Sequence, residues 1–154
     1  MNYPHFIAID PSSHEETSHP IAIAWSMSDG QIKTTLIQPE DDWEDWDYAL
    51  EDLHGINQDT LYQRGETCWS VLREMENDLE ESYLRSDDFE QVERLLGLIY
   101  EACGKELSLE TGSYREEISD QALLKETQEQ LYNTHLTCDD RVLLMLKAWA
   151  EANA

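Results

Sequence analysis

Hydrophobic positions in the first quarter of the chain fall into short continuous runs separated by turn residues. Residues 5–9 and 21–27 are apolar runs rich in β-branched and aromatic side chains and bounded by prolines. Runs of this length are typical of strands buried on both faces. Residues 28–30 have turn chemistry and lead into a third strand over 31–37, so the second and third strands form a hairpin. The sheet is therefore predicted to begin with three antiparallel strands.

Farther along, apolar residues recur at helical spacing. A short helix is predicted over 46–53 with a stop at Gly55, followed by a turn at 58–61 that Asn57 caps. The remaining pattern gives, in order, a helix with Trp69, Leu72, Met75 and Leu79 on one stripe, a strand at 83–86, a helix from Val92 to Gly104, a candidate strand at 107–109, and helices at 118–131 and 138–152. This order predicts one α/β domain, 1–154, with a mixed central sheet flanked by helices.

The net charge is the most unusual feature of the composition. The chain has 34 acidic and 10 basic residues, a net charge of −24, and the basic residues are scattered. Proteins bind nucleic acid largely by neutralising phosphates, so this surface should repel DNA and RNA. Three interpretations stay open: a solvated surface without a role, adaptation to high salt, and an acidic face for a basic protein partner, including mimicry of nucleic acid.

The acids are densest over 38–52, where 8 of 15 residues are Asp or Glu. Such a run repels itself unless Trp43 and Trp46 hold it to the body of the protein. The segment is a candidate contact for a basic partner, with the two tryptophans as anchors, although core packing is their commoner use.

The placing of the cysteines and the shortness of the apolar runs bear on the cellular compartment. Cys68, Cys103 and Cys138 are odd in number and lie far apart in helical patterns, so they are expected to be small buried hydrophobes. No apolar run is long enough to cross a membrane, and the first residues lack a signal-peptide pattern. The sequence therefore predicts a cytoplasmic protein.

Asp10 is the first candidate for chemistry, because it ends the first strand. Open α/β sheets place their sites at the carboxyl ends of strands, although an Asp-Pro turn is an equally simple reason for this residue.

The order of elements and several motifs resemble the ribonuclease H-like 3′–5′ exonucleases of the DEDDh type, in a bacterial branch. The matching stretches are Phe6 to Asp10, His19 to Trp25, Leu36 to Pro39, Trp46-Asp47, His54 to Ile56 with Leu61, Ser86-Asp87 with the helix to Gly104, and His135 to Asp140. In that family four carboxylates hold two divalent metal ions. The resemblance implies Asp10 and Asp140 as ligands of Mg²⁺ or Mn²⁺ and His135 as the base that helps to deprotonate the attacking water.

Two family positions depart from the pattern. Ser12 stands where the family has a glutamate, and an ungapped count from Ser86-Asp87 places the middle-motif acid on Val92, within an apolar stripe. Two carboxylates are a poor set for two Mg²⁺ ions, which require several oxygen ligands. Nearby acids are candidate replacements: Glu15 or Glu16 for Ser12, and Asp87, Asp88 or Glu90 for Val92.

The retained residues also have structural explanations. Thr137 and Asp140 match a helix capping box, His135 suits a hydrogen-bonded loop, and His54 with Gly55 suits a helix end.

Two functions follow. The first is a degenerate exonuclease fold that binds a basic protein and needs no cofactor. The alternative is an active or weakened exonuclease that requires Mg²⁺ or Mn²⁺ and cuts single-stranded DNA, RNA or short oligonucleotides. A third, plainer reading is an α/β domain with an unrelated cleft.

Overall fold

A sheet of three antiparallel strands, in the order β1-β2-β3, forms the centre of the computed structural model, which describes residues 2–133 and 135–154. The strands are β1 (Ile7–Pro11), β2 (Pro20–Ser26) and β3 (Ile32–Leu36). Ile9 pairs with Ile23, and Trp25 pairs with Lys33. Every residue of β2 is buried, as expected of an apolar strand covered on both faces. The predicted three-stranded beginning is confirmed.

A second, smaller sheet pairs β4 (Tyr83–Ser86) with β5 (Glu110–Ser113) in parallel. It meets the first sheet at a bridge between Phe6 and Arg85. There the backbone N–H of Arg85 donates a hydrogen bond of 3.0 Å to the His5 carbonyl. The mixed α/β character is thus confirmed, in two bridged sheets. The candidate strand at 107–109 is instead a connecting segment, whose Leu107 and Leu109 pack against the core. The fifth strand follows it as β5.

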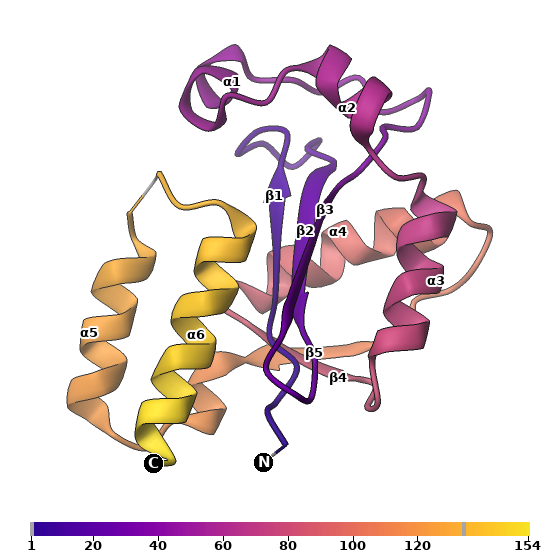
Figure 1. The fold of residues 1–154 in the computed structure, drawn as a ribbon. Coiled ribbons are helices and arrows are strands. Elements are labelled where there is room, and N and C mark those ends of the chain that lie inside the picture. Colours follow the sequence, from indigo (N-terminus) through magenta and orange to yellow (C-terminus); the bar gives the residue numbers. More distant parts are fainter. Residues whose placement is uncertain (1, 134) are drawn as a thin grey trace.

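Helices cover both faces of the central sheet. They are α1 (Tyr48–His54), α2 (Gln58–Arg64), α3 (Cys68–Asp78), α4 (Phe89–Ala102), the 3₁₀ turn η1 (Tyr114–Glu117), α5 (Gln121–Leu131) and α6 (Cys138–Ala152). Figure 1 shows α5 and α6 on one face, α3 and α4 on the other, and α1 and α2 above the end of β1. None of the helices in the described ranges has the length and apolar character that a membrane crossing requires.

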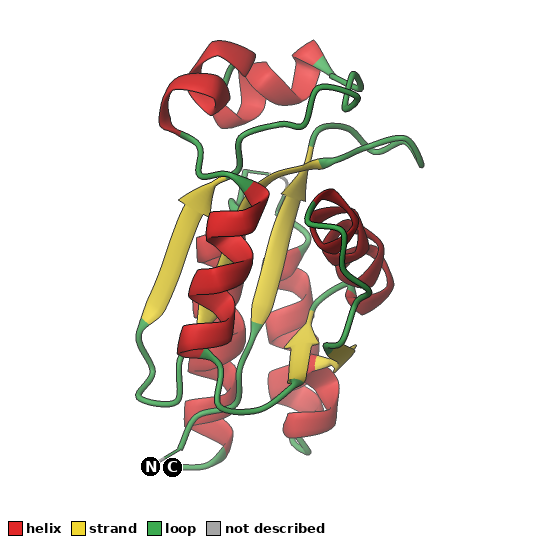
Figure 2. Cartoon of the chain, turned by 90° about the vertical axis from the view of Figure 1, so that its right-hand side faces the viewer, coloured by secondary structure: helices red, strands yellow, loops and turns green. Residues whose placement is uncertain are grey.

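Alternate residues of β1 serve two separate cores. Ile7 and Ile9 face a cluster with α3 and α4, whereas Phe6 and Ala8 face a cluster with α5 and α6. Seen from the side, the strands run between the helices toward α1 and α2, and both chain ends lie at the opposite end (Figure 2). The end of β1 is therefore surrounded by α1, α2 and the start of α6.

Three local predictions are corrected by the structure. The expected turn after Asn57 is the helix α2, which the Asn57 side chain caps by accepting from the Thr60 N–H at 2.8 Å. The pattern was too sparse to reveal it, because Leu61 is the buried residue of α2. Helix α5 begins after Asp120, whose side chain accepts from two backbone N–H groups and so fixes the start of the helix.

Trp69 is the third correction. It is 58% exposed, and α3 instead buries Cys68, Val71, Leu72 and Met75. The Arg73 guanidinium lies 5.3 Å from the Trp69 ring and covers it with a cation instead of the core. The predicted stop at Gly55 is confirmed, since this residue adopts φ 72 at the end of α1.

Candidate functional site

The carboxylate of Asp10 faces the first turn of α6. Asp10 is 2% exposed, and its Oδ2 accepts a hydrogen bond from the backbone N–H of Cys138 at 2.9 Å. Its Oδ1 accepts from Nη2 of Arg141 at 3.0 Å. The end of β1 and the start of the last helix therefore meet, as the sequence predicts.

Arg141 joins two acidic positions at this end of the sheet. Its Nη2 also donates to the Ile9 carbonyl at 3.1 Å, and its Nη1 lies 3.6 Å from Oδ2 of Asp87. The guanidinium therefore lies between the carboxylate that ends β1 and the carboxylate that follows β4. A single cation supplied by the chain itself thus offsets part of the charge of the two carboxylates.

Sequence reasoning missed Arg141, although a signal was present. Cys138, Arg141 and Met145 are spaced three and four residues apart, which places the arginine on the buried face of α6. A basic residue in that position requires an acidic partner, because an unpaired buried charge is costly.

The Asp10 site does not fit a divalent metal ion. A divalent cation on Asp10 would lie next to the Arg141 guanidinium, which repels it, and each Asp10 oxygen already accepts a hydrogen bond, from Arg141 or from the Cys138 N–H. Across residues 2–133 and 135–154 there is no group of three or more His, Cys, Asp or Glu arranged to hold an ion.

Ser12 has a structural role where the exonuclease family carries a glutamate. It is 2% exposed, donates to Oδ2 of Asp45 at 2.7 Å and accepts from the His19 N–H at 3.0 Å. Glu15 and Glu16 are exposed, and neither is among the described residues that line the cavity beside Asp10.

Val92, at the position of the family's middle-motif acid, is buried in the hydrophobic core. Val92 is 3% exposed and belongs to the core cluster under α4. Asp88 caps α4 by accepting from the Gln91 N–H at 3.3 Å, and Glu90 is exposed in the first turn. Two of the candidate replacements come near Asp10: Asp87 lies 3.6 Å from Nη1 of Arg141, and Asp88 lines the same cavity as Asp10.

Asp140 and His135 have local partners. Asp140 Oδ2 accepts from both the N–H and the hydroxyl of Thr137, at 3.2 and 3.0 Å, which is the capping box that the sequence allowed. His135 is exposed, and its backbone N–H donates to the Asn133 side chain at 3.0 Å. Neither is among the described residues lining the cavity beside Asp10. Their catalytic roles stay predictions.

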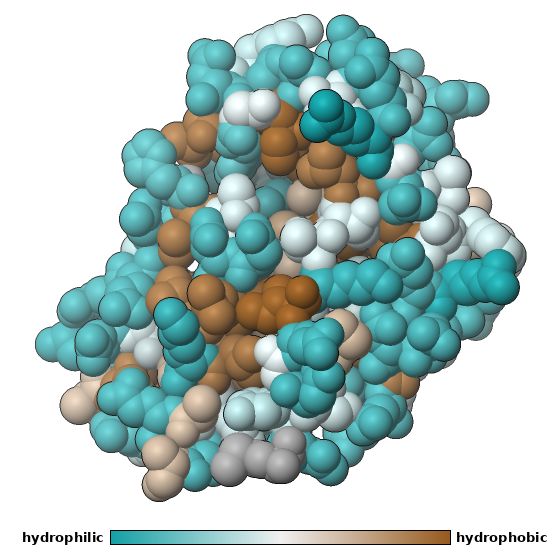
Figure 3. Space-filling model, in the orientation of Figure 1, coloured by the Kyte–Doolittle hydropathy of each residue, from teal (hydrophilic) through white to brown (hydrophobic). Residues whose placement is uncertain are grey.

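A cavity of about 380 Å³ opens beside Asp10, between α1 and the connection from α5 to α6. Its walls carry the apolar side chains Leu50, Leu53, Leu131, Tyr132 and Leu136, together with polar residues that include His14, His54, Asp88 and Arg141. Figure 3 shows hydrophobic side chains around a hollow beneath the top of the molecule, where Figure 1 places α1 above that connection.

A second polar cluster fixes the loop after β1. His19 stacks on Trp43 with ring centroids 5.3 Å apart, and its Nε2–H donates to the Asp45 carbonyl at 2.9 Å. Burial lowers the pKa of His19 below its usual value, outweighing these hydrogen bonds. Burial opposes ionisation of Asp45, but hydrogen bonds from Ser13, Ser12 and Thr17 outweigh it and leave the pKa of Asp45 lowered. The predicted anchoring of the acidic segment by Trp43 is confirmed.

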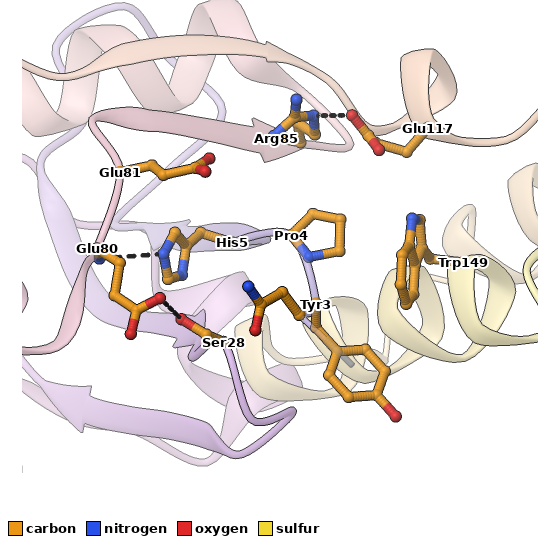
Figure 4. Close-up of a pocket in the computed structure, with 10 residues that line it drawn as sticks. Tyr3, Pro4, His5, Ser28, Glu80, Glu81, Arg85, Glu117 and Trp149 are labelled. Atoms are coloured by element: carbon orange, nitrogen blue, oxygen red, sulfur yellow. Dashed lines mark hydrogen bonds and ion pairs between the residues drawn. The ribbon is translucent and has the colours of Figure 1, made fainter.

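The opposite end of β1 borders a smaller cavity of about 220 Å³. Figure 4 shows His5 between Ser28 and Arg85, with Arg85 turned toward Glu117. His5 Nδ1 donates to the Ser26 carbonyl at 2.8 Å, and its Nε2 accepts from the Glu80 N–H at 3.2 Å. These groups satisfy one another, so this cavity is a structural junction.

Comparisons with known proteins agree with the fold and go no further. No family model matches the chain, and no curated protein matches its sequence. Among solved structures, E. coli Exonuclease I in complex with a dA16 oligonucleotide is similar, with a TM-score of 0.67 and 12% sequence identity. The match covers 99% of this chain and 40% of Exonuclease I, so the chain spans less than half of that protein. The likeness shows that the chain has an exonuclease-like fold.

Proposed function

We propose that this protein is a non-catalytic member of the exonuclease-like fold that binds a basic protein through its acidic surface. The observation that carries the proposal is the ion pair between Asp10 and Arg141, 3.0 Å long and largely buried. It engages the carboxylate for which both the resemblance and the position at the end of β1 support a role in metal binding.

Two-metal hydrolysis requires acidic oxygens that bridge and orient two cations next to the phosphate. Ser12 and Val92 supply a bonded hydroxyl and a buried isopropyl group at two of the four family positions. Arg141 engages the third, and Asp140 is bonded within its own helix cap. The geometry supports loss of the metal chemistry with retention of the fold.

The charge supports a basic partner. A net charge of −24 on 154 residues attracts cationic surfaces over long range and repels the phosphates of nucleic acid. The electrostatic field of this charge favours association with a basic protein, mainly because it raises the association rate.

The alternative is a working exonuclease that requires Mg²⁺ or Mn²⁺. Its support is the similarity to Exonuclease I, a structure that was solved with bound oligonucleotide. Ion binding would then require Arg141 to leave Asp10.

Incubation of the purified protein with labelled single-stranded DNA and RNA, with Mg²⁺ or Mn²⁺, separates the two functions. The proposal expects intact oligonucleotides at every metal concentration and measurable binding to a basic protein such as a histone. Metal-dependent shortening that Asp10→Asn abolishes would establish the alternative.

A further inference from the structure

The cavity beside Asp10 is an apolar recess without a use in the fold described so far. Leu50 is nearly buried in it, Leu53, Leu131 and Leu136 are partly exposed, and Tyr132 is 73% exposed at its edge. Leucine side chains that remain open to solvent on facing walls gain free energy when another apolar group covers them.

The recess lies in an acidic part of the surface. Asp88 lines it, and two exposed acids directly precede lining residues in the chain, Asp52 before Leu53 on α1 and Asp140 before Arg141 on α6. No Lys or Arg occurs in residues 34–63 or 126–140 of the sequence, the segments that carry α1 and the α5–α6 connection. The nearest basic group is Arg141, which is paired with Asp10 and Asp87.

A polar atom in the same recess lacks a partner. His54 Nδ1 is buried and makes no hydrogen bond with the described residues. His54 closes α1 and lines the cavity, so this nitrogen is available to a bound group. Buried polar groups without partners are uncommon, which is a second reason to expect an occupant.

We infer that this recess is the docking groove for a basic amphipathic segment of a partner protein. The segment places leucine-sized side chains between α1 and the α5–α6 connection and sets lysines or arginines against Asp88 and the exposed acids Asp52 and Asp140. This inference rests on the proposed function and deepens it, because it assigns the surface that the basic partner contacts.

Other occupants match the recess less well. A nucleic-acid strand would bring phosphates toward Asp88 and the exposed Asp52 and Asp140, and this approach would be repulsive. A second copy of this chain would bring another surface of strongly negative charge, with a net −24 on each molecule. Charge complementarity therefore favours a cationic, partly apolar segment.

The test uses a fluorescent synthetic peptide designed as an amphipathic helix, with leucines along one face and lysine or arginine elsewhere. A matched peptide replaces each leucine with serine and keeps the charge. Binding is measured by fluorescence anisotropy at two salt concentrations. We expect the leucine peptide to bind at least about tenfold more tightly, with part of its affinity kept at high salt.

Variants of the protein locate the binding site. Tyr132→Ser and Leu53→Ser alter the recess, and Tyr62→Ser is the control, because Tyr62 is a 50% exposed tyrosine on α2 outside it. Asp52→Asn is paired with Asp59→Asn, an exposed acid of the neighbouring helix. Circular dichroism confirms that each variant is folded. We expect roughly fivefold to tenfold weaker binding from the recess variants and little change from the controls.

Three results would overturn the inference. The first is equal binding of the leucine and serine peptides, or equal effects of Tyr132→Ser and Tyr62→Ser, which would indicate attraction by net charge alone. The second is binding of a labelled single-stranded oligonucleotide to the protein that Tyr132→Ser weakens and Tyr62→Ser does not, which would make the recess a nucleic-acid site. The third is a dimer in sedimentation that Tyr132→Ser dissociates, which would make the recess a self-interface.

Failure of the inference is distinguishable from failure of the proposed function. If the peptide misses the recess while oligonucleotides stay intact with Mn²⁺ and a basic protein still binds, the assigned surface alone is wrong. If oligonucleotides are cleaved in a metal-dependent reaction, the proposed function is wrong.

Discussion

Arg141 Nη2 lies 3.0 Å from Asp10 Oδ1 and joins the first turn of α6 to the end of β1. The pair links two elements that are 131 residues apart in the chain. The Cys138 N–H completes the arrangement by donating to the other Asp10 oxygen at 2.9 Å. A guanidinium and a helix N-terminus thus supply the positive charge that a carboxylate at this buried position requires.

Removal of the arginine side chain's charge should destabilise the protein. In Arg141→Met the Asp10 carboxylate is left buried without its cation, and we expect a loss of about 3 kcal/mol in the free energy of unfolding. Urea denaturation followed by circular dichroism measures the loss.

The double variant Asp10→Asn/Arg141→Met serves as the control for that experiment. It removes both charges, so it should recover a large part of the stability lost in Arg141→Met. Additive effects of the two substitutions would contradict a direct ion pair.

Arg94 holds the loop between β1 and β2. Its Nη1 donates to the carbonyls of Glu16 and Ser18 at 3.1 and 2.9 Å. In Arg94→Met we expect backbone amides of this loop to exchange with deuterium about tenfold faster or more, because local opening no longer breaks these bonds. Arg73→Met, which removes a guanidinium over the exposed Trp69, is the control and should leave the loop unchanged.

Stability should fall in mild acid because of His19. Burial lowers the pKa of folded His19 below the 6.5 of an unfolded histidine, so the unfolded chain binds the proton more readily. The contribution of neutral His19 to the free energy of unfolding is therefore complete above pH 6.5 and is lost as the pH falls through the lower pKa of the folded state. In His19→Gln the free energy of unfolding should change less with pH over this range. His14→Gln, at an exposed site, should leave the pH dependence unchanged.

Asp45 acts in a separate, more acidic window. Its folded pKa is lowered below 3.8, because hydrogen bonds from Ser13, Ser12 and Thr17 outweigh the opposing effect of burial. Its contribution is present above pH 3.8 and is lost as the pH falls through the folded pKa. Denaturation curves of Asp45→Asn and wild type should converge in strong acid; a constant difference would refute this linkage.

The three free cysteines should differ in reactivity. Burial, followed by the charge of Glu40, raises the pKa of Cys68 to about 12. Burial, followed by the charge of Asp10, raises the pKa of Cys138 well above normal, although the thiol lies at a helix N-terminus. Cys103 is half-buried, so iodoacetamide should modify it first, as peptide mass spectrometry can follow. Equal rates at Cys103 and Cys138 would contradict the burial of Cys138.

Periodicity was sufficient to predict elements whose buried faces are continuous. The strands β1 to β3 and the helices α4 and α6 follow directly from runs and stripes such as Val92 to Ile99. Helix α2 was missed because it buries Leu61 and otherwise presents polar residues. Trp69 was misplaced because its spacing from Leu72 and Met75 suggested that it shares their buried stripe, whereas its ring lies at the surface under Arg73. Such choices depend on tertiary neighbours that the local sequence does not contain.

The contact between two distant segments was predictable, but its chemistry was not. The resemblance implied that Asp10 and the start of the last helix lie close together, and that Ser12 and Val92 depart from the exonuclease pattern; the Asp10–Cys138 hydrogen bond shows the contact. The sequence did not indicate that Arg141 pairs with Asp10, because the partner of a buried acid is set by a contact across the whole chain.

Calorimetric titration with Mn²⁺ of the wild type and of Asp10→Asn shows whether the end of β1 binds a metal ion, since surface acids contribute equally to both proteins. We expect the same weak isotherm for both, because Arg141 already pairs with the Asp10 carboxylate. A tight site in the wild type that disappears in Asp10→Asn would contradict this expectation.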